Sequence, residues 1–484
     1  MRKFYITTPL YYVNDKPHVG HAFTTVAADV MARWHRLNGE KVFFLTGTDE
    51  HGEKNQKAAE TNGLTPQQYV DGLANTYKDV WKCLNISYDA FIRTSSPSHE
   101  AAAAKFIEMM DKSGDIYKGE YEGWYCVPDE TFFTDFQLAG GKCPDCGREV
   151  KKVKEESYFF RLSRYQQRLL DHYSDNPEFL SPELRSGEIK NRVKAGLRDL
   201  SITRASIKWG VPFPLDRSRT VYVWVEALVG YLSGIGWPNG DSGSIWPADT
   251  HLVGKEINWF HSVIWPAMLM SAGLPVPKRI FAHGWWTVDG KKMSKSIGNI
   301  VDPVGMVKKY SADPFRYFLI REKPLSEDGD FSDKAMVTRI NGELVDDLGN
   351  LVSRTVTLAS RFNGPISGKP ELESYLRLER INELMARFDP FGALEEIWSF
   401  IRSTNKYVND KAPWRLQGSE LANALYNLAE ACRIISILIS PFMPDTSAKI
   451  NSQLGVGAGM LEDCRFGEFR GRITKGEHLF RKVA

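Results

Sequence analysis

Short runs of aromatic and β-branched residues flank one amphipathic stretch at the start of the chain. The runs cover residues 3–8 and 41–46, and residues 22–37 between them place apolar side chains three and four positions apart. A short apolar run favours a buried strand, and the wider spacing is typical of a helix with one buried face. The pattern predicts a strand, a helix and a second strand, and hence a parallel sheet.

A second set of apolar runs follows near the middle of the chain. It covers residues 220–225, 250–254 and 278–282, with an apolar helical pattern over residues 257–270. We expect these three runs to be strands that join the first two in one sheet, because alternation of strands and helices is typical of an α/β fold.

The composition changes from about residue 115 to residue 215, where Gly, Cys, Lys and Glu become more frequent, so we expect an insertion that forms its own small domain. Strand patterns end near residue 332, and residues 338–451 show a helical pattern that predicts a bundle. The expected order is the first half of an α/β domain at 1–114, the insertion at 115–217, the second half at 218–289, a loop and linker at 290–337, and helices with a C-terminal tail at 338–484.

The composition of the 484 residues is that of an ordinary globular protein. Hydrophobic residues make up 42% and charged residues 25%, which excludes a disordered or collagen-like chain. The formal net charge is +2, so any contact with RNA must be local rather than driven by an overall field. Six cysteines are too few for a disulfide framework, which favours a reducing, cytoplasmic location.

No apolar run approaches the roughly 20 residues that a membrane-spanning helix needs. The strongest candidate, residues 425–443, contains Glu430, Arg433 and Pro441, so we interpret it as a core helix. Residues 1–8 have the pattern of a strand rather than that of a signal peptide. We therefore expect no membrane association.

Two histidines follow the first predicted strand, in the segment PLYYVNDKPHVGH. His18, Gly20 and His21 lie where the chain turns into the predicted helix. Open parallel sheets bind ligands at the carboxyl ends of their strands, and helix N-termini attract phosphate. Gly20 has no Cβ and would let a nucleotide approach the backbone. The alternative is a turn with a solvated histidine pair.

A loop rich in lysine and serine lies about 270 residues further on. It reads VDGKKMSKSIGN and contains Lys292, Met293 and Lys295. Such a loop is suited to neutralising the charge that develops on a triphosphate during displacement. The alternative is an exposed basic loop without a ligand.

The His-Val-Gly-His and Lys-Met-Ser-Lys-Ser segments resemble the two signatures of class I aminoacyl-tRNA synthetases. Segments along nearly the whole chain, among them TTPLYYVNDKPHVGHAFTT, FFLTGTDEHG, YVWVEALVGY and LVGKEINWFHSVIWPAML, are similar to the methionyl-tRNA synthetase family. The resemblance implies a Rossmann-like parallel-sheet catalytic domain with a zinc-knuckle insertion, followed by an α-helical bundle that binds the anticodon.

The resemblance also implies a reaction in two steps. The carboxylate of L-methionine attacks the α-phosphate of ATP, which is bound with Mg²⁺, and releases pyrophosphate; the methionyl group then passes to the 3′ end of tRNA(Met), including the initiator tRNA. Positioning and charge stabilisation dominate such displacements. The matching residues are His18 and His21 on the phosphates, Lys295 with Lys292 on the pyrophosphate, Gly20 and Gly254 beneath the nucleotide, Glu256 on the ribose, and His283 with the Met293 backbone beside the adenine.

Methionine would occupy an apolar slot with an anchor for its charged head. By the resemblance, Asp49 binds the α-ammonium and Arg204 orients Asp49. The side-chain slot would be formed by Leu10, Tyr12, Val223, Trp224, Ala227, Tyr231, Ile257 and His261. For any of these residues taken alone, core packing is the simpler interpretation. Homocysteine, one methyl shorter, is expected to be rejected on binding by only about 10- to 200-fold, so some editing is expected.

Three cysteines lie close together in the predicted insertion. Cys126-x-x-Asp129 and Cys143-x-x-Cys146 have the spacing of a zinc ribbon, and four protein ligands indicate a structural zinc. The family more often has Cys or His where Asp129 stands. Alternatives are Glu130 as the fourth ligand, or a knuckle that holds zinc weakly or not at all.

The helical region contains candidates for reading RNA. Asn350 and Arg354 lie one helical turn apart, and Trp414 follows the end of a predicted helix. By the resemblance, the first two would bond anticodon bases and Trp414 would stack on one. The alternatives are a capping Asn, a solvated Arg and a core Trp.

Other classes of protein explain less of the sequence. A cysteine- or leucine-specific synthetase, a small-molecule nucleotidylyltransferase and a non-catalytic RNA-binding protein are the rivals. The cysteines lie in the insertion rather than beside the histidines, and a nucleotidylyltransferase does not explain the long helical region. No further tRNA-binding or dimerisation module follows the helices, so we expect a monomer.

Overall fold

Six parallel strands form the central sheet, in the order β3-β2-β1-β11-β12-β7. Their bounds are β1 Lys3–Tyr12, β2 Lys41–Asp49, β3 Ala90–Arg93, β7 Leu180–Ser181, β11 Thr250–Gly254 and β12 Ile280–His283. The computed structural model describes residues 2–126, 131–133, 138–144, 146–240, 242–288, 290–292 and 298–484. The prediction that the two sets of strands share one sheet is confirmed for β1, β2, β11 and β12.

Helices cover both faces of this sheet. Successive strand residues point to opposite faces, so Phe4 and Ile6 of β1 pack in one core with α1 (Val19–Leu37) and α11 (Ala312–Arg321). Tyr5 packs in a second core. That core contains residues of α4 (Pro97–Lys112), α7 (Val223–Ser233) and α9 (Trp265–Ser271). Helices α3 (Pro66–Cys83) and α10 (Pro303–Tyr310) pack against the first core, and α8 (Ser242–Ile245) packs against the second; α2 spans Glu53–Thr61.

The prediction of a strand over residues 220–225 is wrong for most of its length. Only Thr220–Val221 is a strand, β10, and it pairs antiparallel with β9 (Thr203–Arg204) outside the central sheet. Helix α7 begins at Val223, and every residue of it except Trp224 is buried. A helix buried on nearly all sides shows the same unbroken apolar run as a buried strand, so the pattern could not distinguish them.

The predicted insertion contains an antiparallel sheet in the order β5-β4-β6-β8. Its strands are β4 Ile116–Cys126, β5 Thr131–Phe133, β6 Lys151–Phe160 and β8 Leu200–Ser201. Helices α5 (Gln166–Asp175) and α6 (Glu183–Lys194) lie between β6 and β8 in the sequence. The insertion is not self-contained, however, because β7 lies within it and pairs with β12 of the central sheet. A two-residue strand is too short to be recognised from an alternating pattern.

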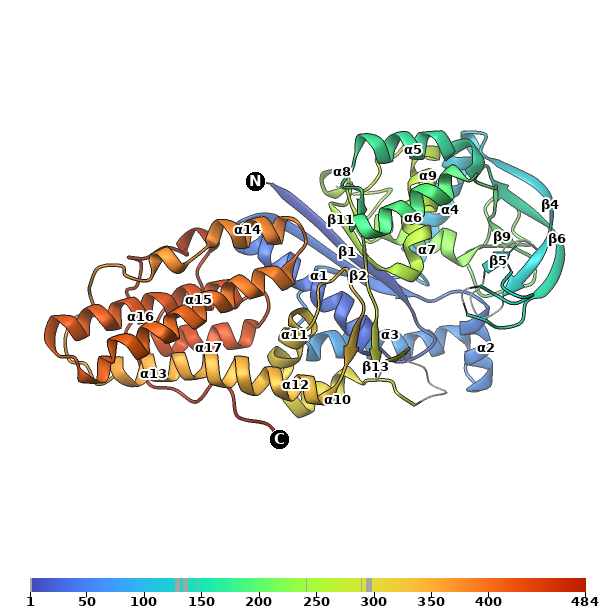
Figure 1. The fold of residues 1–484 in the computed structure, drawn as a ribbon. Helices are drawn as coiled ribbons and strands as arrows, with labels where there is room; N and C mark the ends of the chain where they lie inside the picture. Colours follow the sequence, from blue (N-terminus) through green and yellow to red (C-terminus); the bar gives the residue numbers. More distant parts are fainter. Residues whose placement is uncertain are drawn as a thin grey trace.

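Helices make up the chain after β15. A small sheet of β14 (Lys291–Lys292), β13 (Trp286–Val288) and β15 (Gly329–Phe331) precedes them. The helices are α12 Asp333–Arg339, a π-helical segment Ile340–Gly349, α13 Asn350–Ala359, α14 Leu378–Ala386, α15 Pro390–Lys411, α16 Gly418–Ile439 and α17 Pro444–Leu454. This bundle lies at one end of the molecule and β4 and β6 at the other, with the parallel sheet between them (Figure 1). The helical bundle was predicted correctly.

Helix α16 is the core of the bundle. Among the described residues it is the one helix long and apolar enough to cross a membrane, but 94% of its most apolar window is buried inside the protein. The interpretation of this stretch as a core helix is therefore confirmed.

A buried arginine joins the bundle to the central sheet domain. Arg316 of α11 pairs with Asp29 of α1 at 2.7 Å, and both side chains are fully buried. The same guanidinium donates to the carbonyl oxygens of Phe442 at 3.0 Å and Pro441 at 2.8 Å, just after α16. One charged group thus fixes α1, α11 and the end of α16 against each other.

Candidate active site

The two histidines lie at the N-terminus of α1, at the carboxyl edge of the central sheet. The His18 Nδ1 accepts from the Gly20 backbone N–H at 3.0 Å, and the His18 backbone N–H donates to the His21 Nδ1 at 3.1 Å. The two rings stack with centroids 3.9 Å apart. These reciprocal bonds form a capping box and begin α1 at Val19, three residues before the predicted start.

This capping arrangement fixes where the imidazole protons lie. Burial lowers the pKa of His18, against the opposing effect of the Asp15 and Glu256 carboxylates, and lowers the pKa of His21 well below its usual value. Both rings are therefore neutral near pH 7, and an Nδ1 that accepts a hydrogen bond leaves the proton on Nε2. The pair offers two Nε2–H donors that are suited to phosphate oxygens.

Strands β11 and β12 place a carboxylate and a third histidine near this pair. The Trp285 Nε1 donates to the Glu256 Oε2 at 2.5 Å. The Glu256 carboxylate lies over Gly254, where a Cβ would be 2.4 Å from its Oε1. The His283 Nε2 bonds the Thr24 hydroxyl of α1 at 2.7 Å, and burial lowers the pKa of His283 to about 4. Thr24 joins β12 to α1 and was not predicted from the sequence.

The lysine loop follows β14, which ends at Lys292. Met293, Lys295 and the side chain of Lys292 lie outside the described residues, so their predicted roles are not tested. Beyond the loop, the Val301 carbonyl accepts from the Val19 backbone N–H at 3.0 Å. The chain that leaves the lysine loop therefore contacts the residue next to His18, although the two segments are far apart in sequence.

A small cavity of about 20 Å³ lies beside Asp49, at the end of β2. It is lined by Pro9, Leu10, Asp49, Trp224, Ala227, Leu228, Tyr231, Ile257 and His261. The structure thus gathers most of the residues predicted to bind methionine, and adds Pro9 and Leu228, whose apolar side chains gave no distinguishing signal. Tyr12 and Val223 do not line this cavity, and Val223 lines the neighbouring one instead.

One neutral hydrogen-bonded pair lies in the wall of this cavity. The Tyr231 hydroxyl bonds the His261 Nε2 at 2.7 Å, and the His261 Nδ1 bonds the Ile257 carbonyl oxygen at 3.0 Å. Burial lowers the pKa of His261 to about 4 and raises that of Tyr231. An uncharged, mostly apolar wall suits a polarisable thioether. The cavity has room for about one water.

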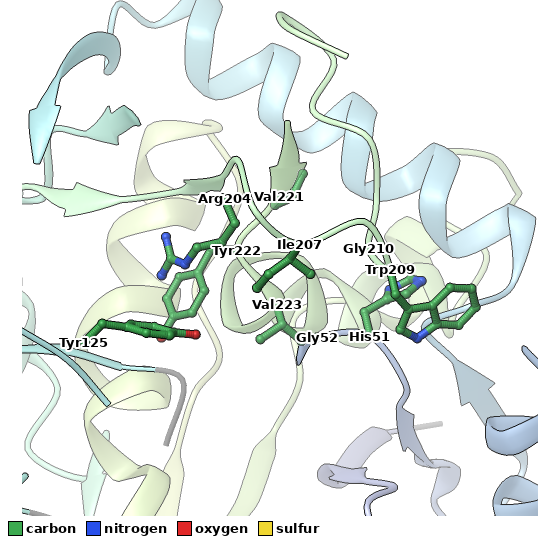
Figure 2. A pocket seen from close by; sticks show the side chains of 10 residues that line it. All are labelled: His51, Gly52, Tyr125, Arg204, Ile207, Trp209, Gly210, Val221, Tyr222 and Val223. Carbon is green, nitrogen blue, oxygen red and sulfur yellow. The ribbon is translucent and has the colours of Figure 1, made fainter. Parts of the chain in front are cut away.

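Arg204 lines the second cavity together with Tyr125 of the insertion and with Val223 (Figure 2). Its guanidinium is buried and lies 4.0 Å from the Tyr222 ring centroid. It donates to the Thr203 carbonyl oxygen at 2.8 Å and lies within 3.4 Å of the Ser201 carbonyl oxygen. The predicted contact with Asp49 is not among these bonds and stays a prediction. His51 and Trp209 line the other end of the cavity.

The three cysteines converge although one is about twenty residues from the others. The Sγ atoms of Cys126, Cys143 and Cys146 all lie within 4.8 Å of one another, and Cys126 and Cys143 are buried. Three thiols at this spacing match the soft ligands that zinc prefers. Asp129 and Glu130 lie outside the described residues, so the fourth ligand stays open.

The candidates for reading RNA are all exposed in the bundle. Asn350 lies inside the continuous helix that runs from α12 to α13, so it is not a cap. Arg354 approaches Asn409 of α15, with 3.5 Å between its Nη1 and the Asn409 Oδ1. Trp414, five residues after Asn409, is 56% exposed. A core position for Trp414 is therefore excluded, and its ring is open to solvent.

Residues 4–155 and 148–356 match the sequence family described as "tRNA synthetases class I (M)". The chain is 48% identical to the methionine–tRNA ligase of Caldanaerobacter subterraneus subsp. tengcongensis, over 100% of this chain and 79% of that one. It is 46% identical to that of Thermotoga maritima, over 99% of this chain and 80% of that one. The chain belongs to the methionine–tRNA ligase family.

Solved structures agree with this membership of the ligase family. Methionyl-tRNA synthetase of Mycobacterium tuberculosis in complex with methionyl-adenylate superposes with a TM-score of 0.95 at 39% identity, covering 99% of this chain and 100% of that one. The free-state structure of the same synthetase gives 0.88 at 35% identity, covering 100% and 99%. The reaction of this class I enzyme is the ATP-dependent ligation of methionine to tRNA.

Proposed function

We propose that the two cavities and the histidine pair at the carboxyl edge of the sheet carry the first step, the formation of methionyl-adenylate. A methionine carboxylate oxygen attacks the α-phosphorus of ATP, and the bond to the β-phosphate breaks as pyrophosphate leaves. The observation that carries this proposal is the neutral His18–His21 pair, whose Nε2–H groups are free of the capping bonds that their Nδ1 atoms make. Such donors stabilise charge that develops on phosphate oxygens.

The nucleotide would lie across β1, β11 and β12. We assign the phosphates to His18 and His21, and the leaving pyrophosphate to Lys295 with help from Lys292. The Glu256 carboxylate would accept from the ribose hydroxyls, above Gly254. The remaining contacts are Gly20 beneath the nucleotide and His283 with the Met293 backbone beside the adenine. Mg²⁺ would enter with ATP as part of the substrate complex.

The amino acid would lie in the cavity beside Asp49. The Asp49 carboxylate would bind the α-ammonium, and Arg204 would orient Asp49. The thioether would contact Trp224, Tyr231 and His261, while Tyr12 and Val223 would form the outer part of the site. In the second step, a ribose hydroxyl at the 3′ end of tRNA(Met), elongator or initiator, attacks the methionyl carbonyl and AMP leaves.

The cysteine cluster would hold one structural zinc through Cys126, Cys143 and Cys146, with Asp129 as the proposed fourth ligand. The anticodon would be bound by Asn350, Arg354 and Trp414 at the far end of the molecule. That the enzyme is a cytoplasmic monomer stays a prediction from the sequence.

Methionine-dependent exchange of pyrophosphate into ATP tests the activation step without tRNA. We expect methionine to be the preferred amino acid in a panel, and His21→Asn to lower the exchange by about 100- to 1,000-fold because a donor to the transition state is lost. His172→Asn, a histidine of α5 outside the site, is the control. Preferred activation of another amino acid, or full activity of His21→Asn, would contradict the proposal.

A further inference from the structure

A carboxylate held by two imidazoles lies buried behind the methionine cavity, and no step described above uses it. The Glu226 Oε1 bonds the His51 Nδ1 at 2.8 Å, and its Oε2 bonds the His99 Nε2 at 2.6 Å. The His99 Nδ1 bonds the Ser233 hydroxyl at 2.8 Å. The side chains of Glu226 and His99 are fully buried, and that of His51 is 2% exposed.

The proton positions in this cluster follow from the carboxylate. Burial acts to raise the pKa of Glu226, but His51 and His99 outweigh it, so the pKa lies below its ordinary value. Burial likewise acts to lower the pKa of His51, but Glu226, Glu100 and Glu50 outweigh it and raise it. An ionised carboxylate only accepts, so both imidazoles donate to it.

The cluster joins three elements that form the methionine cavity or support it. His51 comes two residues after Asp49, the proposed anchor of the ammonium group, and Glu226 lies between Trp224 and Ala227 on α7. His99 belongs to α4, which packs against α7. The bond from Glu226 to His51 is thus the polar link between the end of β2 and the helix that forms the apolar wall.

Both ends of this link are held in place. Trp209 packs edge-on against the His51 ring, with centroids 5.1 Å apart, and its Nε1 donates to the Glu50 carbonyl oxygen at 2.7 Å. Helix α7 begins at Val223, and its N-cap residue Tyr222 makes no side-chain cap hydrogen bond. At Gly230 the helix approaches Leu10 so closely that a Cβ would be 2.3 Å from the Leu10 Cδ1. Glu226, in the first turn of α7, ties this end of the helix to His51 and His99.

We propose that Glu226 is a positioning residue for methionine recognition: held by His51 and His99, it fixes the distance between the Asp49 carboxylate and the apolar wall on α7. This inference rests on the proposed methionine site. A fixed distance between a head-group anchor and a wall selects an amino acid by length. Loosening the link would therefore weaken methionine binding and reduce discrimination against the shorter homocysteine.

Pyrophosphate exchange with the full chain tests this role. Glu226→Ala should raise the KM for methionine by about 10- to 100-fold and leave the KM for ATP within about twofold, because a small misplacement of one substrate costs that much. Glu226→Gln keeps the shape and offers one donor and one acceptor to the imidazoles, so it should recover most of the loss. The ratio of kcat/KM for methionine to that for homocysteine should fall more in Glu226→Ala than in Glu226→Gln.

Glu430→Gln is the matched control, because Glu430 is a fully buried carboxylate of α16 that pairs with Arg433, far from the cavity. It should lower the melting temperature without changing either KM. An unchanged KM for methionine in folded Glu226→Ala, or a parallel rise in the KM for ATP, would overturn the inference. If Glu226→Ala does not fold, the same two criteria apply to His51→Ala, which breaks the same bond from its other end. Failure of the methionine site itself appears separately, as an unchanged KM for methionine in Asp49→Asn.

Discussion

The proton on a histidine is placed by its neighbours, and several side chains of the site depend on this. Backbone bonds to Nδ1 leave the donors of His18 and His21 on Nε2. The His261 Nδ1–H donates to the Ile257 carbonyl oxygen, so its Nε2 accepts from the Tyr231 hydroxyl. Identical side chains thus offer Nε2–H donors in one part of the site and form part of an uncharged wall in another.

The Tyr231 hydroxyl gives a prediction at this scale. Tyr231→Phe leaves the His261 Nε2 without its donor in the cavity wall, and we expect the KM for methionine to rise by about 5- to 10-fold. Pyrophosphate exchange at saturating ATP measures it. Tyr173→Phe removes a comparable buried bond, to the Ser262 carbonyl oxygen at 2.7 Å, outside the cavity. If both variants raised the KM for methionine equally, the rise would reflect a loss of stability rather than a role of Tyr231 in the cavity wall.

At the scale of elements, the ends of strands and the buried helix α16 were predictable, but the buried helix α7 was not. Asp49, Glu256 and His18 each follow an apolar run, where open sheets bind ligands, and local motifs are enough to find them. The run VYVWV gave no indication of helix α7. Glu226, directly after that run and before another apolar stretch, was a visible signal of a buried polar contact. Its partners at positions 51 and 99 could not be known, because only the packing of α7 against α4 and β2 brings them together.

The exposed aromatic after α15 gives a second prediction. Trp414→Ala should lower aminoacylation of tRNA(Met) by about 100-fold, because stacking of a base on the ring is lost. Pyrophosphate exchange should be unaffected, since the cavity lies in another part of the molecule. Tyr375→Ala, at a position 54% exposed in the same region, is the control. Equal loss in both assays would refute the assignment of Trp414 to the anticodon.

The cysteine cluster of the insertion gives a third. We expect about one zinc per chain in protein purified without chelators, and clearly less in Cys143→Ser, as measured by atomic absorption. Cys83→Ser, which alters a cysteine outside the cluster, should keep its zinc. A structural zinc takes no part in the chemistry, so exchange should persist in Cys143→Ser while aminoacylation falls. Sub-stoichiometric zinc in the unaltered enzyme would contradict the site.

For the whole molecule, buried neutral histidines make stability depend on pH. Burial lowers the pKa of His261 and His283 to about 4 in the folded chain, against about 6.5 when unfolded. Below pH 6.5 the unfolded chain binds protons that the folded chain does not. The free energy of unfolding should therefore fall on acidification, by on the order of 2 kcal/mol per histidine at pH 5.

Urea unfolding at pH 7.5 and pH 5.0, at constant ionic strength, measures this loss. His261→Gln cannot take up the proton and should show a shallower decline. Stability that is equal or greater at pH 5.0 would show that these two rings do not stay neutral on folding.

The salt link between Arg316 and Asp29 has a consequence for anyone who wishes to divide this enzyme. The guanidinium donates to the carbonyl oxygens of Pro441 and Phe442, so a fragment that stops before residue 441 would leave a buried arginine with two of its hydrogen bonds unmade. A chimera in which the helical bundle is replaced by that of a relative must therefore keep carbonyl groups at these two positions. The sheet domain therefore includes the two carbonyl groups that follow α16. Its boundary is set by the contacts of this buried arginine rather than by the order of segments along the chain.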